Sequence, residues 1–201
     1  MSVKAGTPLG GGGGFSPFFQ VGQAASGFNL LYSPYDLCAG YAATAFAVDV
    51  LRIVPFAVQV RQRAVIDRIV INQTAAGGAG AVARIGIYRA DPRSLLPTNL
   101  LFGSTSIAMD GANGLKPAAT ALSVAPGDIL WLAHLAGVAA ATITSGGAAL
   151  PATHSVWGFD GVGLANLTLG TLAFPFAALP TPFGAVLPAA AAWPWIGVHY
   201  A

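Results

Sequence analysis

The chain has 201 residues, of which 8% are charged and 55% are hydrophobic, and it contains no glutamate. Average soluble domains carry about 25% charged residues, so we expect other protein chains to cover much of this surface. The net charge of +2, with no basic run interleaved with aromatic residues, argues against nucleic-acid binding. Cys38 is the only cysteine, which excludes a disulfide framework within the chain and a cysteine-rich zinc site.

Residues 1–45 are predicted to form an extended docking arm, and residues 46–201 a β-sandwich domain. The glycine run at residues 10–14 cannot hold a structure by itself, yet seven aromatic residues follow it within 27 positions. We therefore expect the arm to contact another chain through its first aromatic residues, Phe15, Phe18 and Phe19. No apolar signal-peptide segment follows Lys4, which predicts a chain that either stays in the cytoplasm where it is made or is assembled there into something larger.

The next segments in chain order lead into the first strands. Residues 41–49 (YAATAFAVD) are compatible with a short helix or a strand. Residues 50–60 are a β-rich run, in which Pro55 predicts an edge strand or a bulged strand. In residues 64–72, simple alternation places Val65, Ile69 and Ile71 on one face and Ile66 and Val70 on the other. Each face also carries polar residues, so we expect both faces of this strand to be covered.

The stretch that follows contains a charged corner with two prolines, RADPRSLLP (residues 89–97). Residues 81–90 are predicted to form a strand with Ala83, Ile85 and Ile87 on one face and Arg84 and Tyr88 on the other. The lack of a side chain at Gly86 lets another group approach this strand closely. The corner is interpreted as a turn between two sandwich strands, and its alternative interpretation is an exposed contact loop. The sequence APGD (residues 125–128) predicts a type II turn.

The strands after this turn are strongly apolar. Residues 129–136 (ILWLAHLA) are expected to pack Ile129 and Trp131 into the same sandwich as Ile85 and Ile87. Further short strands at residues 141–145 and 193–200 complete a pattern of strands separated by turn signals. This spacing is typical of an all-β, antiparallel β-sandwich or jelly roll.

The C-terminal third is irregular and rich in proline, glycine and alanine. Its prolines leave no room for a membrane-spanning helix of about 20 residues, so no membrane insertion is expected. Residues 129–201 hold a single charged side chain, Asp160. We expect this surplus of apolar surface to drive homo-oligomer formation through contacts that include Trp193 and Trp195.

Catalytic motifs are missing from the sequence. The three histidines, His134, His154 and His199, form no metal-binding spacing, and His134 is expected to be a paired core or interface residue. The aspartates sit mostly at turns, where backbone hydrogen bonding explains them. We therefore predict no catalytic residues, no metal site and no cofactor.

Residues 51–136 resemble a β-sandwich module that is common in tailed-bacteriophage structural proteins. Five motifs carry the resemblance: IVPF (53–56), IDRIVI (66–71), ARIGIYRAD (83–91), NLLFGS (99–104) and LSVAPGDILWLA (122–133). The resemblance implies a virion component that assembles in the host cytoplasm with other virion proteins and performs no catalysis. It implies a fibre, spike or decoration subunit associated with the head or the tail, and by analogy with phage fibres and spikes a trimer is favoured.

A second hypothesis remains open. A carbohydrate-binding or adhesin module would recognise a host surface glycan by stacking aromatic rings on sugars. Tyr88, Trp157, Trp193 and Trp195 are the aromatic candidates, although core or interface packing explains each of them as well. An enzyme is the third and least favoured hypothesis.

Overall fold

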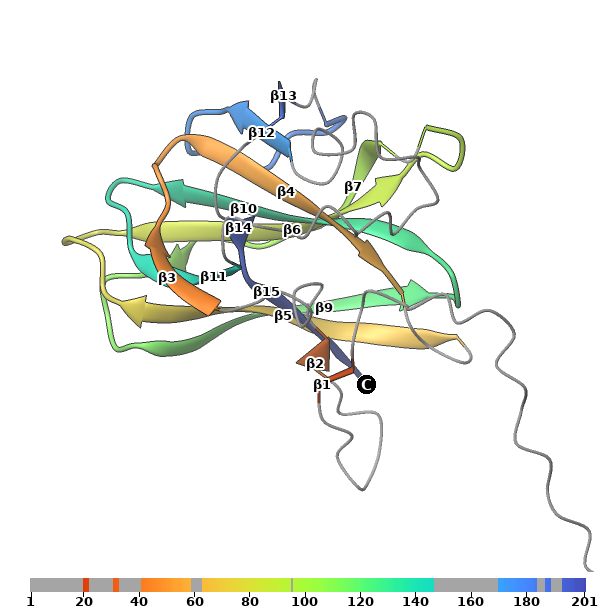
Figure 1. Ribbon diagram of the computed structural model, residues 1–201, viewed down its shortest axis with the longest axis horizontal. Coiled ribbons are helices and arrows are strands. Elements are labelled where there is room, and N and C mark those ends of the chain that lie inside the picture. Colours follow the sequence, from red (N-terminus) through yellow and green to blue (C-terminus); the bar gives the residue numbers. More distant parts are fainter. Residues whose placement is uncertain are drawn as a thin grey trace, which may run out of the picture.

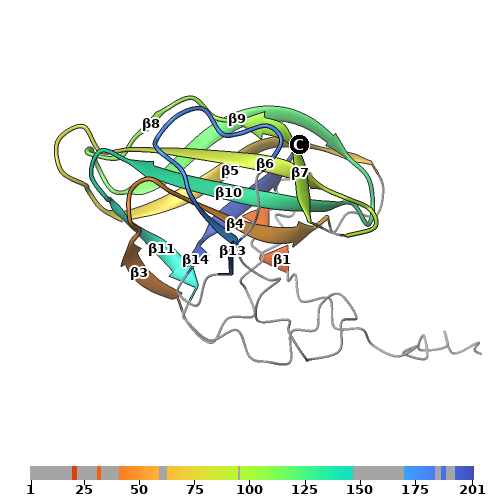
Figure 2. The same cartoon turned by 90° about the horizontal axis from the view of Figure 1, so that it is seen from above.

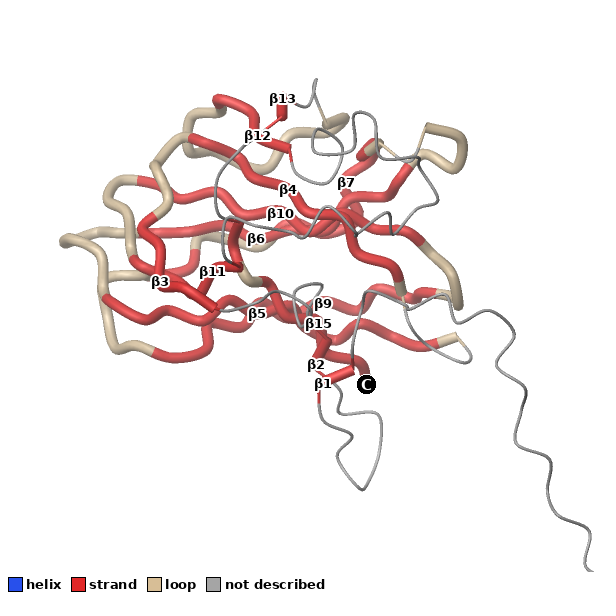
Figure 3. Tube along the Cα trace, viewed as in Figure 1, coloured by secondary structure: helices blue, strands red, loops and turns tan. Residues whose placement is uncertain are grey.

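The computed structural model describes residues 20–21, 31–32, 41–58, 63–94, 96–146, 170–183, 187–188 and 193–201. Within these ranges every regular element is a β-strand, and Figure 3 shows no helix. The strands are β1 (Gln20–Val21), β2 (Leu31–Tyr32), β3 (Tyr41–Ala45), β4 (Val50–Ala57), β5 (Ala64–Ala75), β6 (Val82–Ala90), β7 (Pro97–Gly103), β8 (Ile107–Ala108), β9 (Gly114–Val124), β10 (Ile129–Gly137), β11 (Thr142–Gly146), β12 (Gly170–Ala173), β13 (Leu187–Pro188), β14 (Trp193–Pro194) and β15 (Ile196–Tyr200).

The strands form two antiparallel sheets that face each other as a sandwich (Figure 1). Sheet A has the order β1-β2-β15-β5-β11-β14, with β9 on the other side of β5 and β3 on β11. Sheet B has the order β13-β12-β4-β10-β6-β7, with β8 on β6. Seen from above, the long strands of both sheets run along the same general direction, as in aligned sheet packing (Figure 2). The predicted all-β sandwich is confirmed.

The inner core lies between the two sheets and is built from the inward residues of both. Sheet A contributes Ile66, Ile69, Ile71 and Val198, and sheet B contributes Phe56, Ile85, Ile87, Leu130 and Leu132. These side chains alternate along each strand with residues that point outward, as the pleat requires. The predicted inward face of residues 81–90 is therefore confirmed.

A second apolar layer covers the outer face of sheet B. We call it the outer cluster; its buried members are Leu51, Ile53, Tyr88, Ala90, Trp131, Ala133, Leu135, Leu179 and Phe183. Trp131 is only 3% exposed, so the prediction that it is buried holds. The expectation that it shares one core with Ile85 and Ile87 is corrected, because Trp131 and Ile129 point to the opposite face of sheet B.

Residues 170–183, which we call the strap, close this outer cluster. The strap begins with β12, which pairs with β4, and its amides then bind Asp49: Phe174 N donates to Asp49 O (2.8 Å) and Phe176 N to Asp49 Oδ1 (2.7 Å). At its other end Phe183 N donates to Thr98 O (2.9 Å). The sequence analysis did not predict a strand at β12.

Two glycines of sheet B allow the strap to lie close to it. A Cβ on Gly86 would collide with the Leu179 side chain and lie 2.8 Å from the carbonyl oxygen of Phe102. A Cβ on Gly137 would collide with the Phe176 ring. The expected close approach at Gly86 is thus present, and the strap supplies the approaching group.

A β-bulge in β5 shifts the expected alternation. Tyr200 pairs with Ile66 and His199 with Arg68, so β5 has one extra residue, Asp67, against β15, and its register with β9 also shifts here. Ile66 and Ile69 therefore both point into the inner core, while Val65 is 36% exposed. An extra residue at a bulge reverses the face of every residue on one side of it. The predicted grouping of Val65 with Ile69 is therefore wrong.

Pro55 lies where β4 has fewer partners. Strand β4 pairs with β10 over Leu51–Ala57, but β12 covers only Val50–Ile53. Around Pro55 the strand therefore has one described neighbour, which suits a residue without an amide hydrogen. Residues 41–45, left open between helix and strand by the sequence, form β3.

Candidate functional site

The charged corner and the APGD turn lie side by side at one end of the sandwich. Asp91 Oδ1 accepts hydrogen bonds from the amides of Arg93 (2.9 Å) and Ser94 (2.7 Å), and Asp91 N donates to Leu96 O (2.8 Å). Thr98 Oγ1 donates to Arg89 O (3.0 Å) across the β6–β7 pair. These bonds fix the RADPRSLLP corner between two strands of sheet B.

The APGD turn has the predicted geometry. Asp128 N donates to Ala125 O (3.2 Å), and Gly127 has a φ of 81°, as position i+2 of a type II turn requires. The Asp128 carboxylate accepts the Ala125 amide at Oδ2 (2.8 Å). Both turns are therefore held by an aspartate, and the backbone role proposed for Asp91 and Asp128 is present.

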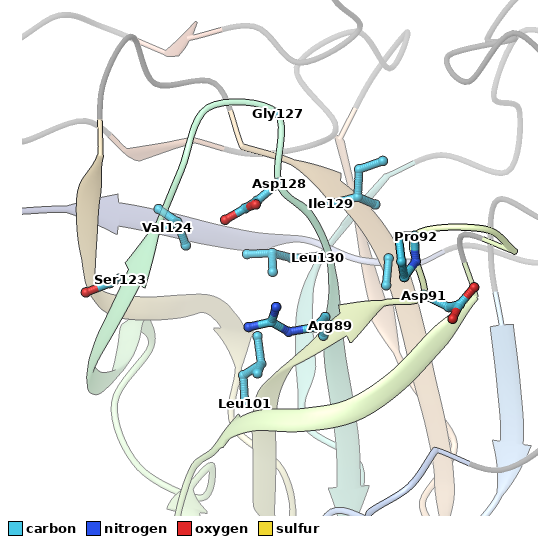
Figure 4. A pocket seen from close by; sticks show the side chains of 11 residues that line it. Arg89, Asp91, Pro92, Leu101, Ser123, Val124, Gly127, Asp128, Ile129 and Leu130 are labelled. Carbon is cyan, nitrogen blue, oxygen red and sulfur yellow. The ribbon is translucent and has the colours of Figure 1, made fainter.

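A pocket of about 350 Å³ opens between these two turns (Figure 4). Its apolar lining includes Leu101, Val124 and Leu130, and its polar lining includes Arg89 and Asp128. In Figure 4 the Arg89 guanidinium reaches between Leu101 and Leu130, and the Asp128 carboxylate lies on the far side of Leu130. Small-ligand pockets usually span about 300–1,000 Å³, so this one suits a small ligand.

Arg89 has no counter-charge within the described part of the chain. No hydrogen bond or ion pair joins its guanidinium to a described residue, and the side chain is exposed. The Asp91 carboxylate, the nearest aspartate in sequence, points away from Arg89 in Figure 4 and already accepts the Arg93 and Ser94 donors. Those donors hold the pKa of Asp91 below its usual value, with the Ser94 amide the largest contributor.

A charged cluster on the outer face of sheet A was missed by the sequence analysis. Asp67 bonds to His199 Nδ1 across the β5–β15 pair and to Arg68 Nη2 (3.2 Å) beside it. Burial acts to raise the pKa of Asp67, but the hydrogen bonds and positive charges of Arg68 and His199 outweigh it and hold the pKa below its usual value. His199 pairs with a single carboxylate, which comes from a residue 132 positions earlier in the sequence.

His134 is a buried residue of β10 in sheet B; its ring contacts Phe46, and the Arg52 guanidinium lies over the Phe46 ring. The ring centroids of Phe46 and His134 are 5.7 Å apart, and the Arg52 guanidinium lies 4.7 Å from the Phe46 centroid. Burial, and then the Arg52 charge, lower the pKa of His134 to about 3. Its Nδ1 has no hydrogen-bond partner among the residues described, so the core position expected for His134 is right and the expected pairing is absent at that atom.

Of the residues predicted to contact other chains, only Trp193 and Trp195 lie within the described part of the chain. Phe15, Phe18 and Phe19 lie outside the described residues, as do Cys38, His154 and Trp157. Trp193 belongs to β14, which pairs with β11, and the half-buried Trp195 donates its amide to Thr144 O (2.9 Å).

Tyr88, a candidate for stacking on a sugar, is fully buried. Its ring packs edge-on against Phe183 with centroids 5.1 Å apart, and its hydroxyl donates to Pro180 O (3.0 Å). Burial raises the pKa of this phenol. Tyr88 therefore holds the strap and cannot present its face to a sugar.

The described residues contain neither a membrane-spanning helix nor a cluster of metal-binding side chains. We find no helix there of the length and hydrophobicity that a membrane crossing requires. In the same ranges, no group of three or more histidine, cysteine or acidic side chains is arranged to hold a metal ion. Comparison with protein-family models and with curated proteins finds no match for this chain.

Proposed function

We propose that this protein is a non-enzymatic structural component of a tailed-bacteriophage particle, associated with the head or the tail. It works through protein–protein contacts and is assembled in the host cytoplasm. The observation that carries the proposal is where the five resembling motifs lie: within or directly beside β4, β5, β6, β7, β9 and β10, the long strands of an antiparallel sandwich.

The use of the charged residues supports a structural role. Asp49, Asp91, Asp110 and Asp128 each accept a backbone amide: those of Phe176, Ser94, Gly80 and Ala125, respectively. Carboxylates placed in this way define turns and connections. The acidic side chains of the sandwich thus contribute mainly to its shape.

The contacts to other virion proteins are assigned to the arm, with Phe15, Phe18 and Phe19 as anchors, and to Trp193 and Trp195. Strands β1, β2 and β3 lie within residues 1–45 and join sheet A of the same chain. Deletion of residues 1–19 removes the three phenylalanines and leaves these strands in place. It therefore separates docking from folding more cleanly than deletion of the whole arm.

The test is particle incorporation of the protein lacking residues 1–19, together with a variant in which Phe15, Phe18 and Phe19 are replaced by alanine. Both should unfold at the same temperature as the full chain and be missing from purified particles, as measured by quantitative mass spectrometry. Alanine at Leu115, which is 57% exposed on β9, serves as a control for loss of an apolar side chain. Normal incorporation of both variants would contradict the proposal.

Self-association is part of the same proposal, with a trimer favoured by analogy with fibres and spikes. The strap buries part of the apolar C-terminal third within the chain, which leaves less of it for contacts between copies than composition alone implies. Light scattering of the purified protein tests this. A stable monomer at micromolar concentration would refute self-association.

A further inference from the structure

The corner pocket combines three features that together select a ligand. It has an apolar floor at Leu101, Val124 and Leu130, a guanidinium at Arg89, and a carboxylate at Asp128. Arg89 and Asp128 do not form an ion pair with each other, so each retains hydrogen-bonding capacity toward a molecule placed between them. In Figure 4 Leu130 lies between the Arg89 guanidinium and the Asp128 carboxylate, and Leu101 lies on the far side of Arg89.

The guanidinium determines one end of the ligand. A planar group with five N–H donors and no internal partner is matched best by a carboxylate, which accepts two parallel hydrogen bonds. The Asp128 carboxylate nearby disfavours a doubly charged anion such as phosphate, because it would repel the second negative charge. A singly charged carboxylate is the anion that this pair of residues accommodates.

Asp128 determines the other end. Its Oδ2 accepts the Ala125 amide, and its remaining lone pairs can accept only from donors. A ligand that reaches Asp128 must therefore present hydroxyl or ammonium groups. Between its two polar ends, the ligand must present C–H groups to the apolar side chains that line the pocket.

We propose that this pocket binds a small carboxylic acid whose carbon skeleton carries hydrogen-bond donors, with its carboxylate on Arg89, its donors on Asp128 and its apolar face on Leu130. Acidic sugars, such as a uronic acid, and free amino acids share this chemistry. The volume of about 350 Å³ is large enough for one sugar ring or one amino acid. The proposal does not depend on the virion role, because the pocket lies within one chain.

The experiment is a set of calorimetric titrations of the full chain with four probes: glucuronate, glucose, alanine and inorganic phosphate. Glucuronate differs from glucose only in a carboxylate that replaces the hydroxymethyl group. If the natural ligand is an acidic sugar, glucuronate should bind and glucose should not. Binding of alanine in place of glucuronate assigns the amino-acid source of the same chemistry. Failure of both carboxylates to bind, or equal binding of glucose and glucuronate, overturns the proposal, as does tighter binding of phosphate than of either.

Variants locate the binding. Arg89→Gln should weaken the carboxylate probe at least about tenfold, the loss expected for a hydrogen bond to a charged group. Asp128→Asn keeps an acceptor for the Ala125 amide and removes the negative charge, so it should weaken the carboxylate probe's donor contacts and strengthen phosphate binding. Arg93→Gln is the matched control, since Arg93 is on the same corner and does not line the pocket. Unchanged binding by Arg89→Gln would overturn the proposal.

Discussion

The outer faces of the two sheets differ sharply in chemistry. The outer face of sheet B carries Leu51, Ile53, Trp131 and Leu135, and the strap lies over them (Figure 1). The outer face of sheet A instead carries polar and charged side chains that bond to one another, among them Asp67, Arg68, Asn72, Thr144 and His199. One face is thus closed by a third layer of the same chain, and the other is stabilised by hydrogen bonds within the sheet.

This difference changes how the low charge content should be understood. Few charged residues mean more apolar surface than one sandwich core can bury, and each large apolar side chain gains about 1.5–3 kcal/mol when it is buried. The strap buries part of that surplus within the chain, through Phe174, Phe176, Leu179 and Phe183. Low charge alone therefore overestimates how much surface must be covered by partners.

The largest expected effect is on the face that the strap covers. Trp131→Ala should lower the free energy of unfolding by about 3–5 kcal/mol, because a large buried ring in the outer cluster is lost. Leu115→Ala, on the exposed edge strand β9, should change it by less than about 0.5 kcal/mol. Chemical denaturation measures both. Similar values for the two variants would show that the outer cluster is not a packed layer.

The next effect concerns the pH dependence of stability that the buried His134 should cause. His134 is neutral in the fold, with a pKa near 3, whereas an unfolded histidine has a pKa of about 6.5. The unfolded chain therefore binds more protons below pH 6.5, and stability falls as the pH drops. The loss should be about 2–3 kcal/mol between pH 6.5 and 4.5, above the range in which the carboxylates of Asp67 and Asp91 titrate.

Denaturation at pH 6.5 and at pH 4.5 tests this effect. His134→Leu removes the titrating group, so its stability should change much less over the same interval. A wild-type protein that is equally stable at both pH values would show that His134 is not held neutral by burial.

A smaller effect is expected where the strap is tied to the sandwich. Asp49 has a φ of 56°, a conformation that aspartate and asparagine tolerate better than most residues. Its side chain and its carbonyl accept the amides of Phe176 and Phe174. Asp49→Ala should cost about 1–2 kcal/mol, and Asp49→Asn, which keeps the acceptor, should cost less in the same denaturation measurement. Equal losses would exclude this role for the carboxylate.

Local signals in the sequence predicted much of the sandwich. Alternation in residues 81–90, the Pro-Gly order of the APGD turn and the glycine at position 86 each depend on neighbours in sequence, and all three features are present. The first half of strand β9, which contains Pro117, was not predicted.

Features that depend on distant segments could not be predicted. The bulge at Asp67 is set by the pairing of β5 with β15, and no local pattern marks it. The Asp67–His199 pair requires β15 to lie beside β5, and the pocket requires two turns to meet at one end of the sandwich. The strap likewise pairs with a strand more than 100 residues earlier. Each of these contacts is set by topology.

The packing of the strap against sheet B is tested most directly by a double-mutant cycle between Gly137 and Phe176. Gly137→Ala should cost about 1–3 kcal/mol, because the new methyl group meets the Phe176 ring. In a Phe176→Ala background the same change should be neutral or slightly stabilising, since alanine is preferred to glycine in a strand. A coupling free energy of at least about 1 kcal/mol is therefore predicted, and an equal cost of Gly137→Ala in both backgrounds would contradict the packing of the strap on this face.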